Sequence, residues 1–239
     1  MRRFGFALAM LVGLIAQPAM ADAKVFVAAS LADVVQALVD ASDIKGLIVV
    51  AGSSSSLARQ IKAGAPADVF ISANKDWAAL VAGEQDLLPL FSNRLVLVSH
   101  KDVTLSDISE LPSLLGNNRL AVGDPNHVPA GIYAREALKS LGLWDALQNN
   151  LAPADNVRAA VRLVQTGAAP FGIVYASDAA LLKLNVVYVF DETAHSPISY
   201  WAVTLADQEP ETLAFMRFLG SADAHAIVAS YGFLSLEGK

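Results

Sequence analysis

Short runs of apolar residues, many of them β-branched, recur along the chain and are followed by segments whose apolar residues repeat at helical spacing. Apolar runs of this length predict buried strands, and apolar residues three or four apart predict one face of a helix. The predicted strands lie at residues 24–28, 47–50, 68–72, 94–98, 119–122, 171–174, 186–190 and 200–205. Strands that alternate with helices predict an α/β fold whose sheets are mainly parallel and flanked by helices.

The same pattern predicts two lobes. Regular strand–helix units give way to mixed turns and acids after residue 99, which marks a boundary. We expect lobe 1 to comprise residues 22–99 plus 202–239, and lobe 2 to comprise residues 100–201. The last segment, with two amphipathic helices between residues 213 and 228, would return to cover lobe 1, so the chain would cross twice through a hinge.

The first 21 residues have the pattern of a signal peptide. Arg2 and Arg3 precede an apolar run over residues 4–16, and a small-x-small cleavage site ends at Ala21. A membrane anchor is the alternative, but it needs about 20 apolar residues, and this run is shorter. We therefore expect cleavage after Ala21, a periplasmic location and no membrane insertion of the mature chain.

Four serines at residues 53–56 separate a predicted strand from a predicted helix. In an open α/β sheet, such a turn lies beyond the carboxyl ends of the strands, where ligands bind and where the helix start offers unpaired N–H groups to an anion. The alternative is that one serine caps the helix and the others are small turn residues. Capping needs only one of the four serines, so the run favours a ligand-binding turn.

Two further turns have the same character. Ser30 opens a helix directly after the first strand, and Asp33 stands three positions on, as in a capping box, which competes with a role of Ser30 in ligand binding. A second helix is predicted to begin near Pro129, because proline is favoured in a first helical turn, and the N–H groups of Ala130 and Gly131 then point forward.

Two more positions follow in the second half of the chain. Asp155 is predicted to cap a helix that contains Val157, and Tyr175 stands at the carboxyl end of a strand, where its phenol either donates into a cleft or lies in the core. All these turns offer neutral donors, which suit a fully ionised oxyanion, whereas a protonated oxyanion would also need an acceptor.

Charge and cysteine content narrow the function. Cleavage of the signal peptide would remove Arg2 and Arg3. The mature chain would then have 15 basic and 23 acidic residues, and its net charge of −8 disfavours nucleic acid as a partner. The sequence has no cysteine, which excludes a thiolate nucleophile, a disulfide and cysteine-ligated zinc.

The sequence lacks the common motifs of enzyme active sites. The sequence has no GxSxG, P-loop, GxGxxG or HExxH motif, and its four histidines are scattered. A serine hydrolase that uses Ser54, His127 and Asp124 is the enzymatic alternative, although His127 is more simply explained as an exposed loop imidazole.

Four segments together resemble the periplasmic molybdate-binding proteins of ABC importers: residues 27–31, 54–68, 120–131 and 172–175. The resemblance covers nearly all of the mature chain. It implies a type II periplasmic-binding fold with two hinge crossovers, which closes on molybdate or tungstate and delivers it to membrane permease subunits. It further implies a monomer that is not an enzyme and has no cofactor, with molybdenum present only in the bound oxyanion.

The resemblance also implies roles for individual residues. Ser30 and Ser54 would donate hydroxyl and backbone hydrogens, Ala130 and Val157 backbone N–H groups, and Tyr175 its phenol. Asp33 departs from the family pattern, and its carboxylate would repel a dianion if it faced the cleft.

Three other functions compete with this one. Another tetrahedral oxyanion such as sulfate is the nearest alternative, and a serine hydrolase is more remote. The effector-binding domain of a transcription regulator is disfavoured by the signal peptide and by the absence of a basic helix-turn-helix.

Overall fold

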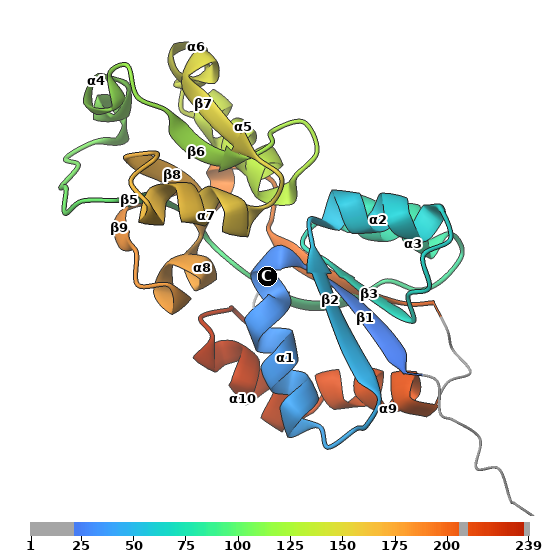
Figure 1. Ribbon diagram of the computed structural model, residues 1–239. Coiled ribbons are helices and arrows are strands. Elements are labelled where there is room, and N and C mark those ends of the chain that lie inside the picture. The colour runs from blue at the N-terminus through green and yellow to red at the C-terminus, as the bar shows by residue number, and fades with distance from the viewer. Residues whose placement is uncertain (1–21, 206–209, 237–239) are drawn as a thin grey trace, which may run out of the picture.

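A computed structural model describes residues 22–205 and 210–236, and the predicted signal peptide lies outside them. The described chain forms two lobes, each built on a five-stranded mixed sheet with helices on both faces (Figure 1). This confirms the predicted two-lobed α/β fold.

In the sheet of lobe 1, the strand order is β2-β1-β3-β10-β4. Its strands are β1 (Ala23–Ala28), β2 (Leu47–Gly52), β3 (Val69–Ser72), β4 (Leu88–Ser92) and β10 (Ser199–Thr204). β1 lies parallel to both β2 and β3, so that Val25 is paired with Val49 on one side and Val69 on the other. β10 is antiparallel to β3 and to β4.

The sheet of lobe 2 repeats this arrangement with the order β7-β6-β8-β5-β9. Its strands are β5 (Leu95–Ser99), β6 (Leu120–Gly123), β7 (Leu151–Ala154), β8 (Phe171–Tyr175) and β9 (Asn185–Val189). β6 is parallel to β7 and β8, whereas β5 is antiparallel to β8 and β9. Each sheet therefore has three parallel strands whose carboxyl ends lie at one edge.

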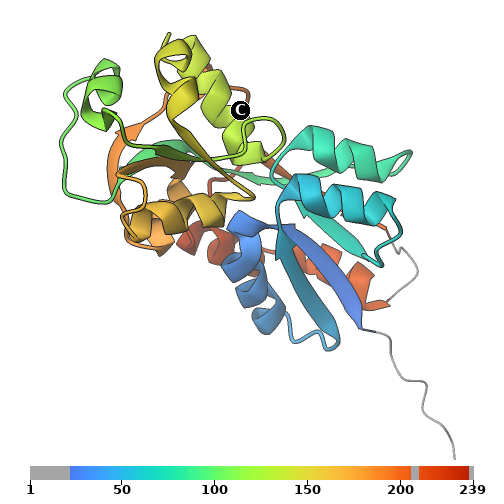
Figure 2. The same ribbon diagram turned by 45° about the horizontal axis from the view of Figure 1, so that its top comes forward.

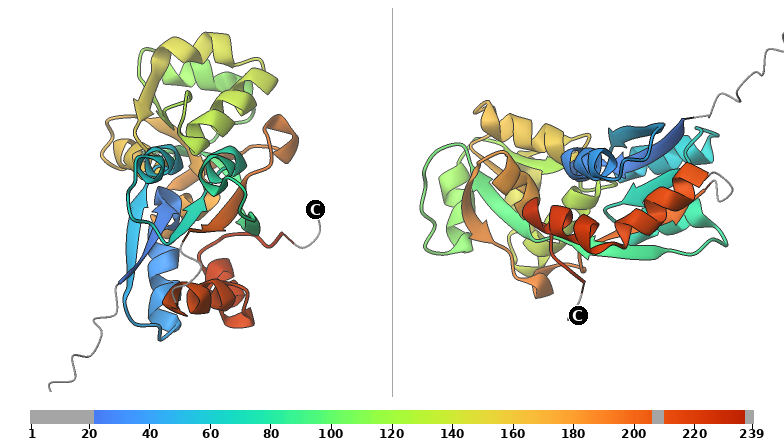
Figure 3. Two further views of the ribbon diagram at one scale, coloured as in Figure 1. Left: turned by 90° about the vertical axis from the view of Figure 1, so that its right-hand side faces the viewer. Right: turned by 90° about the horizontal axis from the view of Figure 1, so that it is seen from below.

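Helices cover both faces of both sheets. They are α1 (Ala32–Ala41), α2 (Ser54–Lys62), α3 (Lys75–Ala82), α4 (Leu111–Leu115), α5 (Pro129–Ser140), α6 (Trp144–Leu147), α7 (Val157–Gln165), α8 (Ala176–Leu181), α9 (Pro210–Leu219) and α10 (Ala222–Ser230). Short 3-10 turns occur at η1 (Ala29–Leu31), η2 (Ile108–Glu110), η3 (Gln148–Asn150) and η4 (Glu192–Ala194). In lobe 1, α2 and α3 lie on one face, while α9 and α10 run beside α1 on the other, as predicted for the last two helices (Figure 3).

The strand pairing corrects the expected lobe boundaries. The sequence pattern predicts residues 95–99 in lobe 1, but β5 pairs with β8 and β9 in the sheet of lobe 2. The same pattern predicts residues 199–201 in lobe 2, but they belong to β10 in the sheet of lobe 1. The chain therefore crosses between the lobes at residues 93–94 and again at residues 190–198.

Two edge strands were not predicted. β4 contains Pro89 and β7 contains Pro153, and proline within an apolar run argues against a strand. Each of these strands lies at the edge of its sheet, the position within a sheet at which proline is tolerated.

Candidate functional site

The carboxyl ends of the six parallel strands meet at a small cavity between the lobes. Its lining residues directly follow or end those strands or begin the helices after them: Ala28, Ala29, Ser30, Ser53, Ser54, Ala73, Val128, Pro129, Ala130, Asn156, Val157 and Tyr175. The five residues to which the resemblance gives a binding role, Ser30, Ser54, Ala130, Val157 and Tyr175, are among them, whereas Gly131 is not. No charged side chain belongs to this lining, as far as the described residues show.

Three helices begin at the cavity with free backbone donors. α2 and α5 have no side-chain cap, so the first N–H groups of α2 and those of Ala130 and Gly131 in α5 have no partner within their helices. In α7, the side chain of Asn156 accepts the N–H of Ala159 at 3.0 Å and leaves the N–H of Val157 free. Each helix start also contributes the positive end of its dipole, so the cavity favours an anion.

The cap of α7 corrects one expectation. Asp155 was predicted to cap this helix, but the capping residue is Asn156, one position later. Asn156 also lines the cavity, whereas Asp155 does not.

Close backbone contact fixes the start of α5 against the end of β6. A Cβ atom on Gly131 would lie 2.0 Å from the carbonyl oxygen of Gly123, and a Cβ atom on Gly123 would lie 2.6 Å from a methyl group of Val128. Only glycine at both positions allows this approach. The N–H of Ala130 is thereby held at the cavity.

The Ser54 hydroxyl is oriented by the neighbouring backbone. Its Oγ accepts the N–H of Ala73 at 3.0 Å, and the side chain is fully buried. An oxygen that accepts a hydrogen bond can still donate its own hydrogen, so the Ser54 hydrogen is available to a ligand in the cavity.

Ser30 is oriented by a chain of hydrogen bonds that starts at Asn93. Asn93 Oδ1 accepts the N–H of Arg94 at 2.9 Å and that of Ser177 at 3.4 Å, which fixes the amide. Asn93 Nδ2 then donates to Tyr200 Oη at 3.2 Å, and Tyr200 Oη lies 3.0 Å from Ser30 Oγ. Tyr200 Oη already accepts from Asn93, so its own hydrogen can be donated to Ser30, and this arrangement leaves the Ser30 hydrogen for a ligand.

The capping box expected from Ser30 and Asp33 does not form. α1 has no side-chain cap, and Asp33 is absent from the cavity lining. The Asp33 carboxylate instead forms an ion pair with Arg158, whose Nη1 lies 2.8 Å from Asp33 Oδ2. A repulsive carboxylate therefore does not face the cavity.

Tyr175 is a buried residue whose phenol lines the cavity. The residue is 1% exposed, and in the described part of the chain its hydroxyl has no hydrogen-bond partner. Burial raises the pKa of Tyr175 well above 10, with smaller contributions from Tyr200 and Tyr133. The group is therefore a protonated donor at neutral pH, and a buried donor without a partner is costly unless a ligand accepts from it.

The serine run divides into different roles. Ser53 and Ser54 line the cavity, whereas Ser55 Oγ bonds to Ser53 at 2.9 Å and lies 3.1 Å from His127 Nδ1. Ser56 lies outside the lining, near Arg59 at 3.5 Å.

The triad proposed for a hydrolase is not assembled. His127, expected to be an exposed loop residue, contacts Ser55 rather than Ser54, and its Nε2 is 3.6 Å from Asp124. Ser55 does not belong to the cavity lining, so the serine that contacts His127 is not the one placed at the cavity.

Several lining residues are not among the donors expected from the sequence: Ala28, Ala29, Ala73, Val128, Pro129 and Asn156. Their positions directly after predicted strands or at predicted helix starts were the available signal. Asn93 and Tyr200 gave no such signal, because their contacts join segments more than 80 residues apart.

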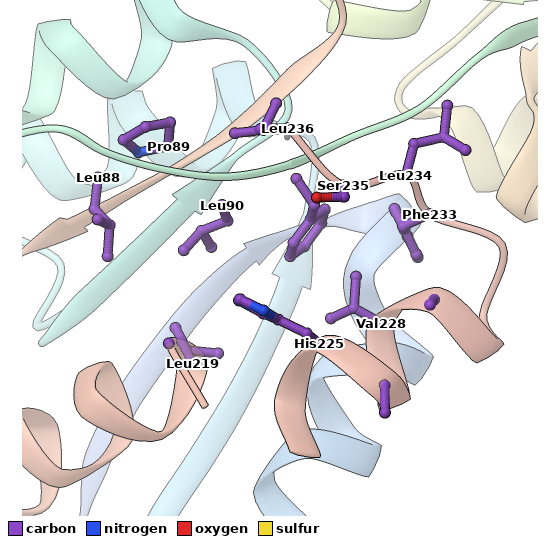
Figure 4. Close-up of a pocket in the computed structure, with 14 residues that line it drawn as sticks. Leu88, Pro89, Leu90, Leu219, His225, Val228, Phe233, Leu234, Ser235 and Leu236 are labelled. Atoms are coloured by element: carbon purple, nitrogen blue, oxygen red, sulfur yellow. The ribbon is translucent and has the colours of Figure 1, made fainter. Parts of the chain in front are cut away.

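A larger cavity of about 740 Å³ lies elsewhere, between β4, α10 and the C-terminal segment (Figure 4). Its lining is almost entirely apolar, with Leu88, Leu219 and Phe233 among the residues and His225 and Ser235 as the polar side chains. It offers an anion none of the converging donors of the small cavity.

Two features are absent from residues 22–205 and 210–236. No three His, Asp or Glu side chains in these ranges are grouped to hold a metal ion. A helix with the length and apolar character to cross a membrane is likewise absent from them.

The bacterial extracellular solute-binding proteins are the class that this fold and site define: their family model matches residues 23–234, and the chain belongs to that family. It is 44% identical over 224 residues to the molybdate-binding protein ModA of Escherichia coli, with 87% of each chain covered. It is 36% identical over 231 residues to ModA of Haemophilus influenzae, with 90% of this chain and 91% of the relative covered.

A solved structure supports the fold independently. The periplasmic molybdate-binding protein of Azotobacter vinelandii superposes with a TM-score of 0.79 at 24% sequence identity, over 89% of this chain and 98% of that one. Together with the two relatives, it confirms the resemblance drawn from the sequence segments.

Proposed function

We propose that this protein binds molybdate, and also tungstate, in the cavity between its lobes and delivers it to an ABC importer. The observation that carries the proposal is a lining of uncharged donors supplied by both lobes: Ser30, Ser54, Ala130, Val157 and Tyr175. Its relatives named as molybdate-binding proteins support the same ligand.

The chemistry of the lining favours a fully ionised anion. Hydroxyl and backbone N–H groups stabilise negative charge without a counter-ion, and charge-assisted hydrogen bonds of this kind are about twice as strong as neutral ones. Hydrogen phosphate carries a proton that needs an acceptor, and no carboxylate lines the cavity in the described residues. We therefore expect weak binding of phosphate.

The remaining parts of the proposal concern location and partners. The signal peptide at residues 1–21 would direct export to the periplasm, with cleavage after Ala21. There the mature chain would act as a monomer without a cofactor or turnover, and its partners would be the permease subunits of the importer.

Titration calorimetry of the ligand-free protein tests the ligand. We expect heat of binding with molybdate and tungstate and little with sulfate, because the shorter bonds of sulfate leave some donors out of reach. Equal affinity for sulfate would replace the molybdate proposal with a sulfate carrier, and strong phosphate binding would contradict the donor-only lining. Native mass spectrometry of protein from a molybdate-supplied culture provides an independent identification of the bound ion.

A further inference from the structure

Arg158 stands directly beside the cavity and belongs to no part of its lining. It follows Val157 in the first turn of α7, and its guanidinium lies between two carboxylates that come from different lobes. Asp178, in α8 of lobe 2, is one of them, and Asp33, in the first turn of α1 of lobe 1, is the other.

The contact within lobe 2 fixes the arginine. Asp178 is fully buried, and its Oδ1 accepts from Arg158 Nε in a short hydrogen bond. The planar guanidinium is therefore held in one orientation by a residue of its own lobe, and Nη1 is directed toward lobe 1.

The contact with lobe 1 crosses the interface. Arg158 Nη1 lies 2.8 Å from Asp33 Oδ2, with 23% of the arginine side chain and 48% of the aspartate side chain exposed. Figure 2 shows α7 of lobe 2 lying against the start of α1. Separation of the lobes would break this ion pair and leave the Arg158–Asp178 pair intact.

We propose that Asp33 and Arg158 form a latch that holds the lobes together and slows the release of the bound anion. The identity of the released anion rests on the proposed function, whereas the ion pair between Asp33 and Arg158 is independent of it. Because Asp178 already orders the arginine, the latch costs less side-chain entropy than an ordinary surface ion pair. A neutral contact also crosses the interface, because Tyr133 Oη donates to the carbonyl oxygen of Ala73 at 3.2 Å.

A competing role for Asp33 makes the opposite prediction. If its negative charge acted mainly on the nearby anion, its removal would strengthen binding and slow release. If it acts as a latch, its removal weakens closure and accelerates release.

The test compares Asp33→Asn with Asp40→Asn. Both residues lie on α1 and both changes remove one negative charge, but Asp40 is an exposed residue bonded to Gln36 of its own helix at 2.9 Å. Stopped-flow measurement of tryptophan fluorescence can follow molybdate release, because Trp77 Nε1 donates across the interface to the carbonyl oxygen of His127 at 3.1 Å.

We expect release from Asp33→Asn to be about two- to fivefold faster than from the wild type, the range for a partly exposed ion pair, and release from Asp40→Asn to be unchanged. Added salt should accelerate release from the wild type toward the rate of Asp33→Asn, which itself should change little. Asp33→Lys, which places like charges together, should release faster still. Unchanged or slower release from Asp33→Asn overturns the latch.

A ligand-independent readout separates this inference from the proposed function. If the wild type does not bind molybdate, the proposed function fails, and the latch is then judged by small-angle scattering of the ligand-free protein. The latch requires a larger radius of gyration for Asp33→Asn than for Asp40→Asn, and equal radii refute it.

Discussion

The hydroxyl oxygens of Tyr200 and Ser30 lie 3.0 Å apart, although the two residues are 170 positions apart, and Tyr200 can donate its hydrogen to Ser30 over this distance. Tyr200→Phe removes this donor, so the Ser30 hydroxyl is no longer held with its hydrogen toward the ligand. We expect molybdate to bind about two- to tenfold more weakly, the value of one neutral hydrogen bond. Calorimetry checks this, with Tyr188→Phe in the edge strand β9 as the control, and an unchanged dissociation constant for Tyr200→Phe would contradict the relay.

Ser54 and Ser56 provide a matched pair within one serine run. Ser54→Ala removes a hydroxyl that lines the cavity, and a charge-assisted hydrogen bond is worth about 1.5 to 3 kcal/mol, or about tenfold to 150-fold in affinity. Ser56→Ala removes a hydroxyl outside the lining and should bind like the wild type. Thermal unfolding must show that both variants are folded. Equal loss in both variants would mean that the run acts through the helix start rather than through Ser54.

Tyr175→Phe is expected to separate stability from binding. The Tyr175 hydroxyl is buried without a partner in the described chain, so its removal should leave the free energy of unfolding of the empty protein unchanged or about 1 kcal/mol higher. Ligand binding should weaken, because one donor to the anion is gone. A loss of stability in the ligand-free variant would show that the phenol has a structural partner.

The backbone donor of Val157 can be removed without removing its helix. Val157 is the first residue of α7, a position that tolerates proline because its N–H has no partner within the helix. Val157→Pro should abolish most molybdate binding, whereas Val157→Ala, which keeps the N–H, should retain it. Circular dichroism shows whether α7 persists in both variants, and similar affinities would exclude the Val157 N–H from the site.

Asp178 should give the stability an unusual dependence on pH. Burial raises the pKa of Asp178 to about 6, since desolvation outweighs the opposing effect of Arg158. Between about pH 4 and 6 the folded state then binds more protons than the unfolded state, so the contribution of Asp178 to the free energy of unfolding falls as pH rises. For a fully buried group the change amounts to about 3 kcal/mol.

The measurement compares the wild type with Asp178→Asn. Denaturant unfolding of both proteins at several pH values cancels the titration of the other carboxylates. We expect the wild type to gain stability relative to the variant as pH falls from 6 to 4. The reverse slope would mean that Arg158 lowers the pKa more than burial raises it.

Local pattern was enough to predict most of the architecture. Apolar runs predicted eight of the strands within one or two residues of their ends, because a buried strand needs continuous apolar character. The lobe boundary could not be predicted, since membership of a sheet depends on pairing partners distant in sequence. β5 and β10 look alike as apolar runs, and only their partners place them in opposite lobes.

In the candidate site, too, local features could be predicted from the sequence and long-range contacts could not. Positions after strands and at helix starts could be recognised locally, and they include Ser30, Ser54 and Ala130. The partner of Asp33 could not, because Arg158 is 125 positions away and the local capping pattern suggested Ser30 instead. The contacts that orient the donors are long-range even where the donors themselves are local.

The contact between Gly123 and Gly131 limits how this protein could be adapted to another cargo. Where these residues touch, the wall in lobe 2 is main chain, whose dimensions no substitution can enlarge or reduce. Engineering for a bulkier or more compact anion would have to begin on the opposite wall, where Ala28, Ala29 and Ala73 have side chains that can be exchanged.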